Sequence, residues 1–132
     1  MVIRADLDYI EIGENTNIQD NAVVHVDPNL PTIIGSNVTV GHSAIVHGAI
    51  ISSNVLIGMG AIILSGAKIG EGSVIGAGTL VKENHEIEPF SLVVGVPGRV
   101  IRKLDKSIIN TIKSHAKEYI RIAKKNLEEK EL

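Results

Sequence analysis

The chain has 132 residues, of which 44% are hydrophobic and only 2% are aromatic, and its formal net charge at pH 7 is −2. This charge gives no general attraction for nucleic acid or an anionic membrane, and no segment approaches the ~20 apolar residues that span a bilayer. Because cysteine is absent, disulfides and thiolate ligands are excluded, and a metal would have to bind histidine or carboxylate side chains. We expect one cytoplasmic domain with an aliphatic core.

The first predicted element is a long array of six-residue repeats. Aliphatic residues recur, mostly six apart, at Ile12, Ile18, Val24, Ile34, Val40, Val46, Ile51, Ile57, Ile63, Ile69, Ile75, Val81, Ile87 and Val93. A helix would space apolar residues three and four apart, and a flat sheet would alternate them strictly. Period six predicts short straight segments between tight bends, three of which close a triangular coil. The pattern is typical of an all-β solenoid, a left-handed parallel β-helix of hexapeptide repeats.

The second predicted element is a C-terminal amphipathic α-helix. The strand repeats end at residues 94–98, where glycine and proline interrupt them. Apolar residues then recur at helical spacing, at Ile108, Ile109, Ile112, Ala116, Tyr119, Ile120, Ala123 and Leu127. Asp105 is the expected N-cap of this helix. We therefore expect a β-helix over residues 1–98 and a connector with the helix over residues 99–132, within one domain.

The register of the β-helix places three histidines. When successive repeats are assigned to faces one, two and three in rotation, His25 and His47 fall on face three of consecutive coils, about one strand spacing apart. His42 falls on face two, from which it does not reach the same ion within one chain. In a threefold trimer, face two of one subunit can meet face three of the next. This register favours a metal site of His25, His42 and His47 over three unrelated surface histidines, whereas we expect His85 and His115 to be structural.

The same register places an ion pair. If Ile3 belongs to face three of the preceding coil, Arg4 lies in the column of the two stacked histidines. Asp20 then lies below His42 on face two, with Gln19 beside it. We expect Arg4 to face the neighbouring subunit's Asp20 in a charge-assisted pair, which would serve either assembly alone or the site as well.

Five motifs together resemble the γ-class carbonic anhydrases. They are Arg4-Ala5-Asp6, NIQDNAVVH at 17–25, GHSAIVHG at 41–48, IGMGA at 57–61 and LVVGVP at 92–97. The resemblance implies a homotrimer with interfacial sites that bind Zn²⁺, or in some members Fe²⁺ or Co²⁺. It also implies reversible hydration of CO₂ to bicarbonate, because a metal with three imidazole ligands lowers the pKa of bound water to about 7.

The resemblance also implies roles for individual residues. His25 and His47 would be ligands from one subunit and His42 the ligand from its neighbour. Arg4 and Asp20 match the intersubunit ion pair of the family. Gln19 matches a residue that hydrogen-bonds the metal-bound water, with Asn17 beside it, and Tyr119 resembles a helix tyrosine that approaches the site.

Two departures from the family pattern leave alternatives open. Leu7 stands where well-studied active members carry an acidic residue, and the short loop at 26–31 lacks the glutamate of their proton-shuttling loop, leaving Asp27 as a nearby candidate. The first alternative is a metal-binding trimer with little hydratase activity, serving as a structural or small-molecule-binding protein. The second is an acyltransferase, since many hexapeptide-repeat proteins transfer acyl groups with a single catalytic histidine.

Overall fold

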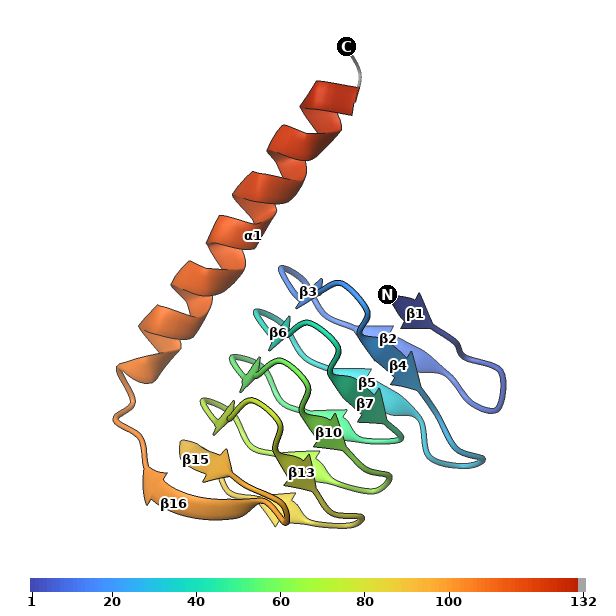
Figure 1. The fold of residues 1–132 in the computed structure, drawn as a ribbon, viewed down its shortest axis with the longest axis vertical. Helices are drawn as coiled ribbons and strands as arrows, with labels where there is room; N and C mark the ends of the chain where they lie inside the picture. Colours follow the sequence, from blue (N-terminus) through green and yellow to red (C-terminus); the bar gives the residue numbers. More distant parts are fainter. Residues whose placement is uncertain (131–132) are drawn as a thin grey trace.

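The six-residue repeats form short strands that stack into three parallel sheets, one for each predicted face. The computed structural model describes residues 1–130. Its coils stack as parallel strands in about five turns, which confirms the predicted solenoid (Figure 1). Pairing of Ile3 with Val24 confirms that Ile3 belongs to face three.

The three faces have the following strands. Face one contains β2 (Ile10–Ile12), β5 (Thr32–Ile34), β8 (Ile50–Ile51), β11 (Lys68–Ile69) and β14 (Glu86–Ile87). Face two contains β3 (Asn17–Ile18), β6 (Thr39–Val40), β9 (Leu56–Ile57), β12 (Val74–Ile75), β15 (Ser91–Val94) and β16 (Arg99–Lys103). Face three contains β1 (Val2–Ile3), β4 (Val23–His25), β7 (Ile45–His47), β10 (Ile62–Ile63) and β13 (Leu80–Val81).

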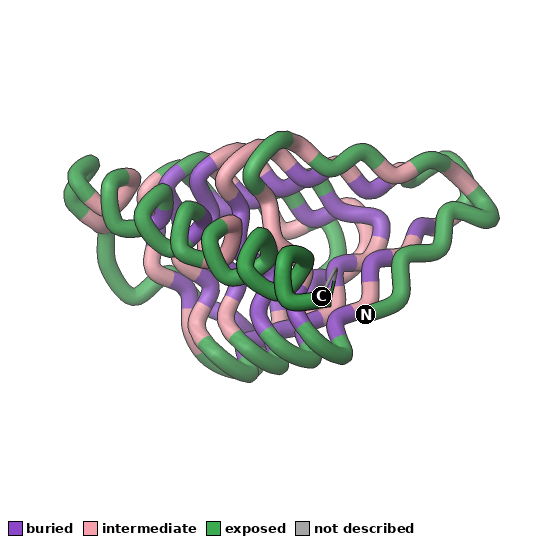
Figure 2. Tube along the Cα trace, turned by 90° about the horizontal axis from the view of Figure 1, so that it is seen from above, coloured by how far each residue is buried: buried purple, intermediate pink, exposed green. Residues whose placement is uncertain are grey.

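The core fills the inside of the coils with the repeated aliphatic side chains. The largest of these are at most 1% exposed: Ile34, Ile51, Ile57, Ile63, Ile69, Ile75, Val24, Val40 and Val46. Figure 2 shows the buried residues along the coils, whereas the C-terminal helix is exposed over most of its length. Each buried side chain of this size contributes roughly 1.5–3 kcal/mol, so burial fixes which side chains of a strand point outward.

The end of the β-helix differs from the predicted connector. After β15 the chain reverses, and β16 pairs antiparallel with it. The exposed residues of β16 carry no repeat pattern, which is why the periodicity did not predict a strand there. This added strand occupies the edge of the face-two sheet, an edge that would otherwise leave backbone groups unpaired.

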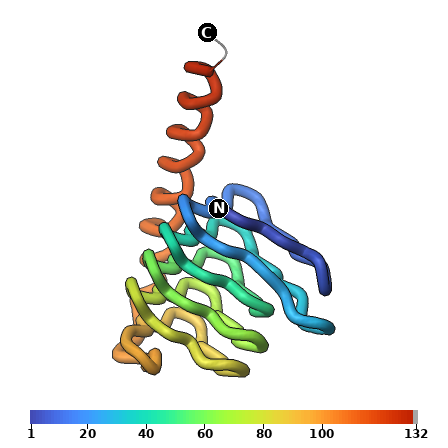
Figure 3. Tube along the Cα trace, turned by 45° about the vertical axis from the view of Figure 1, so that its right-hand side comes forward, coloured from blue at the N-terminus to red at the C-terminus, as the bar shows by residue number. Residues whose placement is uncertain are grey.

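The C-terminal helix α1 (Ile108–Lys130) lies along face two. Asp105 caps it as predicted, because Ser107 N donates to Asp105 Oδ1 at 2.8 Å; this bond lowers the pKa of Asp105. Ile112 and Ala116 of the predicted stripe are buried, but Leu127 is 63% exposed. Figures 1 and 3 show α1 running beyond the first coil, so the later part of the stripe has no coil beneath it. Within residues 1–130 no helix combines the length and apolar character needed to cross a bilayer.

Candidate metal centre

His25 and His47 lie opposite each other in neighbouring coils, as the register predicts. They pair across β4 and β7. Val24 and Val46 beside them are fully buried, so the alternation along each strand directs both imidazoles outward. His25 Nδ1 lies 3.0 Å from His47 Nε2, and the ring planes are 70° apart. Two ring nitrogens therefore converge on one small volume at the surface of face three.

Asp6 holds the far side of the His25 ring. Its Oδ1 lies 2.7 Å from His25 Nε2, and Arg4 Nη1 donates to Asp6 Oδ2. Because an ionised carboxylate only accepts hydrogen bonds, His25 Nε2 is the donor in this contact. The hydrogen bond from His25, with the positive charge of Arg4, lowers the pKa of Asp6. His25 Nδ1, which faces His47, is left as the acceptor nitrogen of a neutral ring.

His47 is held by a serine and an aspartate from other coils. His47 Nδ1 lies 2.9 Å from Ser65 Oγ, and Ser65 Oγ donates to Asp27 Oδ2 at 2.6 Å. Thr32 Oγ1 donates to the backbone oxygen of His25 and so anchors the other end of the loop that carries Asp27. Both imidazoles are therefore oriented by outer hydrogen bonds, as metal-ligating histidines usually are.

His42 lies on face two with Asp20. His42 Nδ1 is 3.5 Å from Asp20 Oδ1, close to the predicted stacking of these two residues. Within residues 1–130 no three histidine, cysteine, aspartate or glutamate side chains are grouped so that they could hold a metal ion. The structure thus brings together two of the three predicted ligands, and the contribution of His42 from a neighbouring subunit stays a prediction.

Two of the other predicted site residues, Gln19 and Tyr119, line a cavity between α1 and face two. This cavity, of about 260 Å³, is lined by Gln19, Thr39, Gly41, His42, Leu56, Ile57, Gly58, Met59, His115 and Tyr119. Asn17 accepts a hydrogen bond from Gln19 Nε2 at 3.0 Å and donates to Thr39 Oγ1 at 2.9 Å. Tyr119 and Gln19 therefore lie beside His42, and not beside the histidine pair of their own chain.

Some residues of this region were not predicted from the sequence. Asp6 appeared only as part of a motif, and Ser65 carried no signal because it occupies an ordinary corner of the repeat. His115, which we expected to be exposed or packed and not a ligand, is exposed, and it also lines the cavity with Tyr119, one helical turn away. Its spacing from Tyr119 was the signal that could have shown this.

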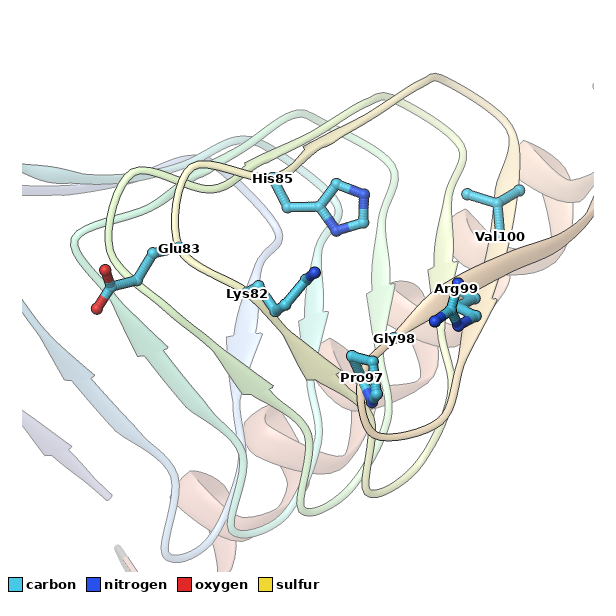
Figure 4. Close-up of a pocket in the computed structure, with 7 residues that line it drawn as sticks. All are labelled: Lys82, Glu83, His85, Pro97, Gly98, Arg99 and Val100. Carbon is cyan, nitrogen blue, oxygen red and sulfur yellow. The ribbon is translucent and has the colours of Figure 1, made fainter.

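A larger cavity lies at the opposite end of the β-helix. It has a volume of about 570 Å³ and is lined by Lys82, Glu83, His85, Pro97, Gly98, Arg99 and Val100. In Figure 4 the carboxylate of Glu83 points away from the other lining side chains. His85 Nδ1 is buried and has no hydrogen-bond partner among the described residues. This cavity shares no lining residue with the histidine pair.

Comparison with known proteins agrees with this fold. The family described as "Bacterial transferase hexapeptide (six repeats)" matches residues 48–83. A protein of Methanocaldococcus jannaschii named "Probable carbonic anhydrase" is 56% identical over 122 residues, which are 92% of this chain and 77% of the relative. "Gamma carbonic anhydrase 2, mitochondrial" of Arabidopsis thaliana is 41% identical over 128 residues, 92% of this chain but only 46% of the relative.

The solved structures give the same fold. A hexapeptide transferase family protein of Anaplasma phagocytophilum superposes with a TM-score of 0.86 at 38% identity, covering 92% of this chain and 72% of its own. A putative acetyltransferase of Bacillus cereus has a TM-score of 0.76 at 33% identity, covering 91% and 83%.

The repeat and these matches define the class: a left-handed β-helix protein of the hexapeptide-repeat type. Within that class, the identity with the carbonic anhydrases extends over most of the chain. The chain belongs to the γ-class carbonic anhydrase family. The names of these relatives agree with the expectation that it is an enzyme, of the lyase class.

Proposed function

We propose that the chain forms a homotrimer that reversibly hydrates CO₂ to bicarbonate at metal sites between subunits. His25 and His47 of one subunit and the neighbouring subunit's His42 would hold the metal, Zn²⁺ or alternatively Fe²⁺ or Co²⁺. A divalent metal on three neutral imidazoles supplies a hydroxide nucleophile at neutral pH. The observation that carries the proposal is the spacing of the two oriented imidazoles.

That spacing fits a metal ion. Two nitrogens each ~2.0–2.1 Å from a tetrahedral ion lie roughly 3.3 Å apart. His25 Nδ1 and His47 Nε2 are 3.0 Å apart, so a shift of a few tenths of an ångström would seat an ion between them. The proposal takes the third protein ligand from another chain, which agrees with the absence, within residues 1–130, of a group of three histidine, cysteine, aspartate or glutamate side chains that could hold a metal ion.

Face three also has the surface that an interface with a second copy needs. Val23, Ile45, Ile62 and Leu80 point outward from it, next to the histidine pair, and each is only half-buried by its own chain. The Arg4 side chain is 60% exposed and the Asp20 side chain 88% exposed. Both charges are therefore accessible for the predicted intersubunit pair.

The face-two cavity suits the substrate. Leu56, Ile57 and Met59 give it an apolar wall, which matches the apolar CO₂ molecule. Because Gln19 Nε2 donates to Asn17, the remaining Gln19 Oε1 is the atom that can accept a hydrogen bond from the attacking water and so orient it. Tyr119 and His115 line the same cavity from the side of the helix.

The test combines metal analysis with kinetics. Protein purified without a chelator or a histidine tag should contain about one metal ion per chain and catalyse CO₂ hydration in stopped-flow assays, run with and without oxygen. His42→Ala should abolish activity while the trimer persists in light scattering. Metal without activity would favour the metal-binding trimer instead. Absence of metal, with acetyl transfer from acetyl-coenzyme A, would favour the chemistry suggested by the Bacillus cereus relative.

A further inference from the structure

We propose that Ser65 and Asp27 are positioning residues that hold His47 in the tautomer whose Nε2 is free to bind a metal. The consequence for metal affinity rests on the proposed function, whereas the tautomer itself does not. The inference also gives Asp27 a role different from the proton shuttle that the sequence suggested.

The direction of each hydrogen bond follows from counting protons. Ser65 has one hydroxyl hydrogen, and it is donated to Asp27 Oδ2 at 2.6 Å because the carboxylate has no proton to give. Ser65 Oγ can then only accept from His47 Nδ1, at 2.9 Å. His47 Nδ1 therefore carries hydrogen, and in the neutral ring His47 Nε2 has a free lone pair. Without Asp27 the hydroxyl could turn and donate to His47 Nδ1, which would move the ring hydrogen to Nε2.

The tautomer of the neighbouring histidine, His25, is fixed by a different residue, Asp6. Asp6 requires the hydrogen of His25 on Nε2, so the two nitrogens that face each other across 3.0 Å, His25 Nδ1 and His47 Nε2, both lack hydrogen when the rings are neutral. Two lone pairs at this distance repel each other unless a cation lies between them. Asp6 and the Ser65–Asp27 pair therefore prepare the same point for a positive ion.

The short loop after His25 places Asp27 for this task. Asp27 N donates to Leu30 O at 3.3 Å and Leu30 N donates to Asp27 O at 3.0 Å, which closes a tight turn. The left-handed backbone at Asn29, with φ of 60°, completes it. A longer loop would hold its acid less firmly. The brevity of residues 26–31, which departs from the acidic loop of well-studied relatives, is explained by this contact.

Zinc affinity of four variants tests the proposal. Ser65→Ala should weaken zinc binding by roughly 10–100-fold in competition with a chelator, as expected for loss of an outer-shell partner. Ser65→Thr keeps the hydroxyl and should stay within about 3-fold of the parent protein. The zinc affinity of Asp27→Ala should lie between those of Ser65→Ala and Ser65→Thr. Asp27→Asn should lose less zinc affinity than Asp27→Ala, because its amide oxygen still accepts a hydrogen bond from Ser65. Ser53→Ala is the matched control, since Ser53 accepts a corner hydrogen bond from Ser36 N at 3.0 Å on another part of the coil.

A spectroscopic measurement separates positioning from folding. In ¹⁵N-labelled, metal-free protein, long-range ¹⁵N–¹H spectra should show His47 Nδ1 protonated, and Ser65→Ala should lose this preference without changing the thermal midpoint by more than Ser53→Ala does. Equal zinc affinity of Ser65→Ala and parent protein would overturn the inference alone. A parent protein that binds none of Zn²⁺, Fe²⁺ and Co²⁺ would overturn the proposed function. Protonated His47 Nδ1 would then still support the Ser65–Asp27 contact, and unprotonated Nδ1 would refute it.

Discussion

Single residues of the proposed site act in two ways. Some fix the direction of a hydrogen bond, and others lack a side chain so that a neighbouring backbone can approach closely. Asp6 belongs to the first kind, because a carboxylate can only accept from His25 Nε2. Gly58 belongs to the second kind: a Cβ at this position would lie 2.6 Å from the backbone nitrogen of Ala77 in the next coil. Each kind predicts a different result of substitution.

Removal of the Asp6 carboxylate should weaken the metal site. Asp6→Ala leaves His25 free to exchange its ring hydrogen between nitrogens, so we expect zinc affinity to fall on the order of 10-fold. Asp8→Ala is the matched control, because Asp8 Oδ1 accepts only from the neighbouring Tyr9 N. Chelator competition measures both. The hydrogen bond from His25 lowers the pKa of Asp6. The stabilisation from this contact is therefore fully present at pH values above the ordinary carboxyl pKa and is lost as pH falls through the lowered pKa.

Gly58 should tolerate no side chain. Gly58→Ala forces the backbones of two stacked coils apart, and we expect it to destabilise the fold by about 1–3 kcal/mol. Gly78→Asn is the comparison: Gly78 has a φ of +69° with nothing within 4 Å of an added Cβ, and asparagine already adopts this conformation at Asn37, with φ of 56°. Urea unfolding should show the Gly78 variant within about 0.5–1 kcal/mol of the parent protein. Equal losses in the two variants would contradict the close approach at Gly58.

At the scale of elements, strands and helix depend on different kinds of contact. The strands are two to five residues long, and those in the middle of the β-helix are held by burial of their inward side chains and by pairing with the coils on either side. The helix α1 begins at a cap and is fixed to face two by Ile112 and Ala116, so its first turns carry most of its contacts with the coils. Loss of the cap should therefore affect the docking of the helix more than the coils themselves.

The Asp105 cap should show a defined pH dependence. Asp105→Ala removes the acceptor of Ser107 N and should lower the thermal midpoint at pH 7 by on the order of a few degrees. The pKa of Asp105 is lowered in the folded chain, so its stabilisation is fully present above the unfolded value and is lost as pH falls through the lowered pKa. The difference between variant and parent in calorimetry should therefore shrink as pH falls through the lowered pKa of Asp105 and vanish at a pH below it. A difference that is constant down to that pH would argue against the cap.

Periodicity predicted the elements that repeat and missed those that do not. Pairing of His25 with His47 follows from the six-residue period once the Asp27–Thr32 loop is set aside. The strand β16 was missed because it is exposed and pairs antiparallel, outside the repeat. Ser65 was missed because the direction of a side chain at a corner depends on the local bend of the backbone. The six-residue pattern of the sequence contains no information on that direction.

At the scale of the whole molecule, each metal site of the proposed trimer is divided between two chains. Face three contributes a histidine pair that is already oriented, and face two contributes His42 beside a cavity roofed by α1. Neither face carries three ligands, so the metal and the interface stabilise each other, and metal removal should raise the dissociation constant of the trimer without dissociating it at the concentrations used for light scattering. The outward apolar residues of face three would supply most of the buried area.

A charge exchange tests the interface. Arg4→Asp alone and Asp20→Arg alone each place like charges together across every interface of the proposed trimer, and each should weaken trimer formation at least ~10-fold. The double variant restores opposite charges and should recover most of the trimer. Light scattering over a concentration series, at low and high salt, measures the shift. A double variant that dissociates as fully as the single variants would show that Arg4 and Asp20 do not face each other.

The orienting residues of the histidine pair occupy four adjacent rungs of face three. His25 and His47 end β4 and β7, while Asp6 and Ser65 follow β1 and β10 on either side. The hydrogen bonds of the two imidazole rings stay within these rungs and the adjoining loop. Coils added or removed outside this stretch would leave the geometry of the pair unchanged, because each coil contacts only its neighbours. The geometry of the pair therefore depends on these four coils and the adjoining loop alone, whatever the number of coils beyond them.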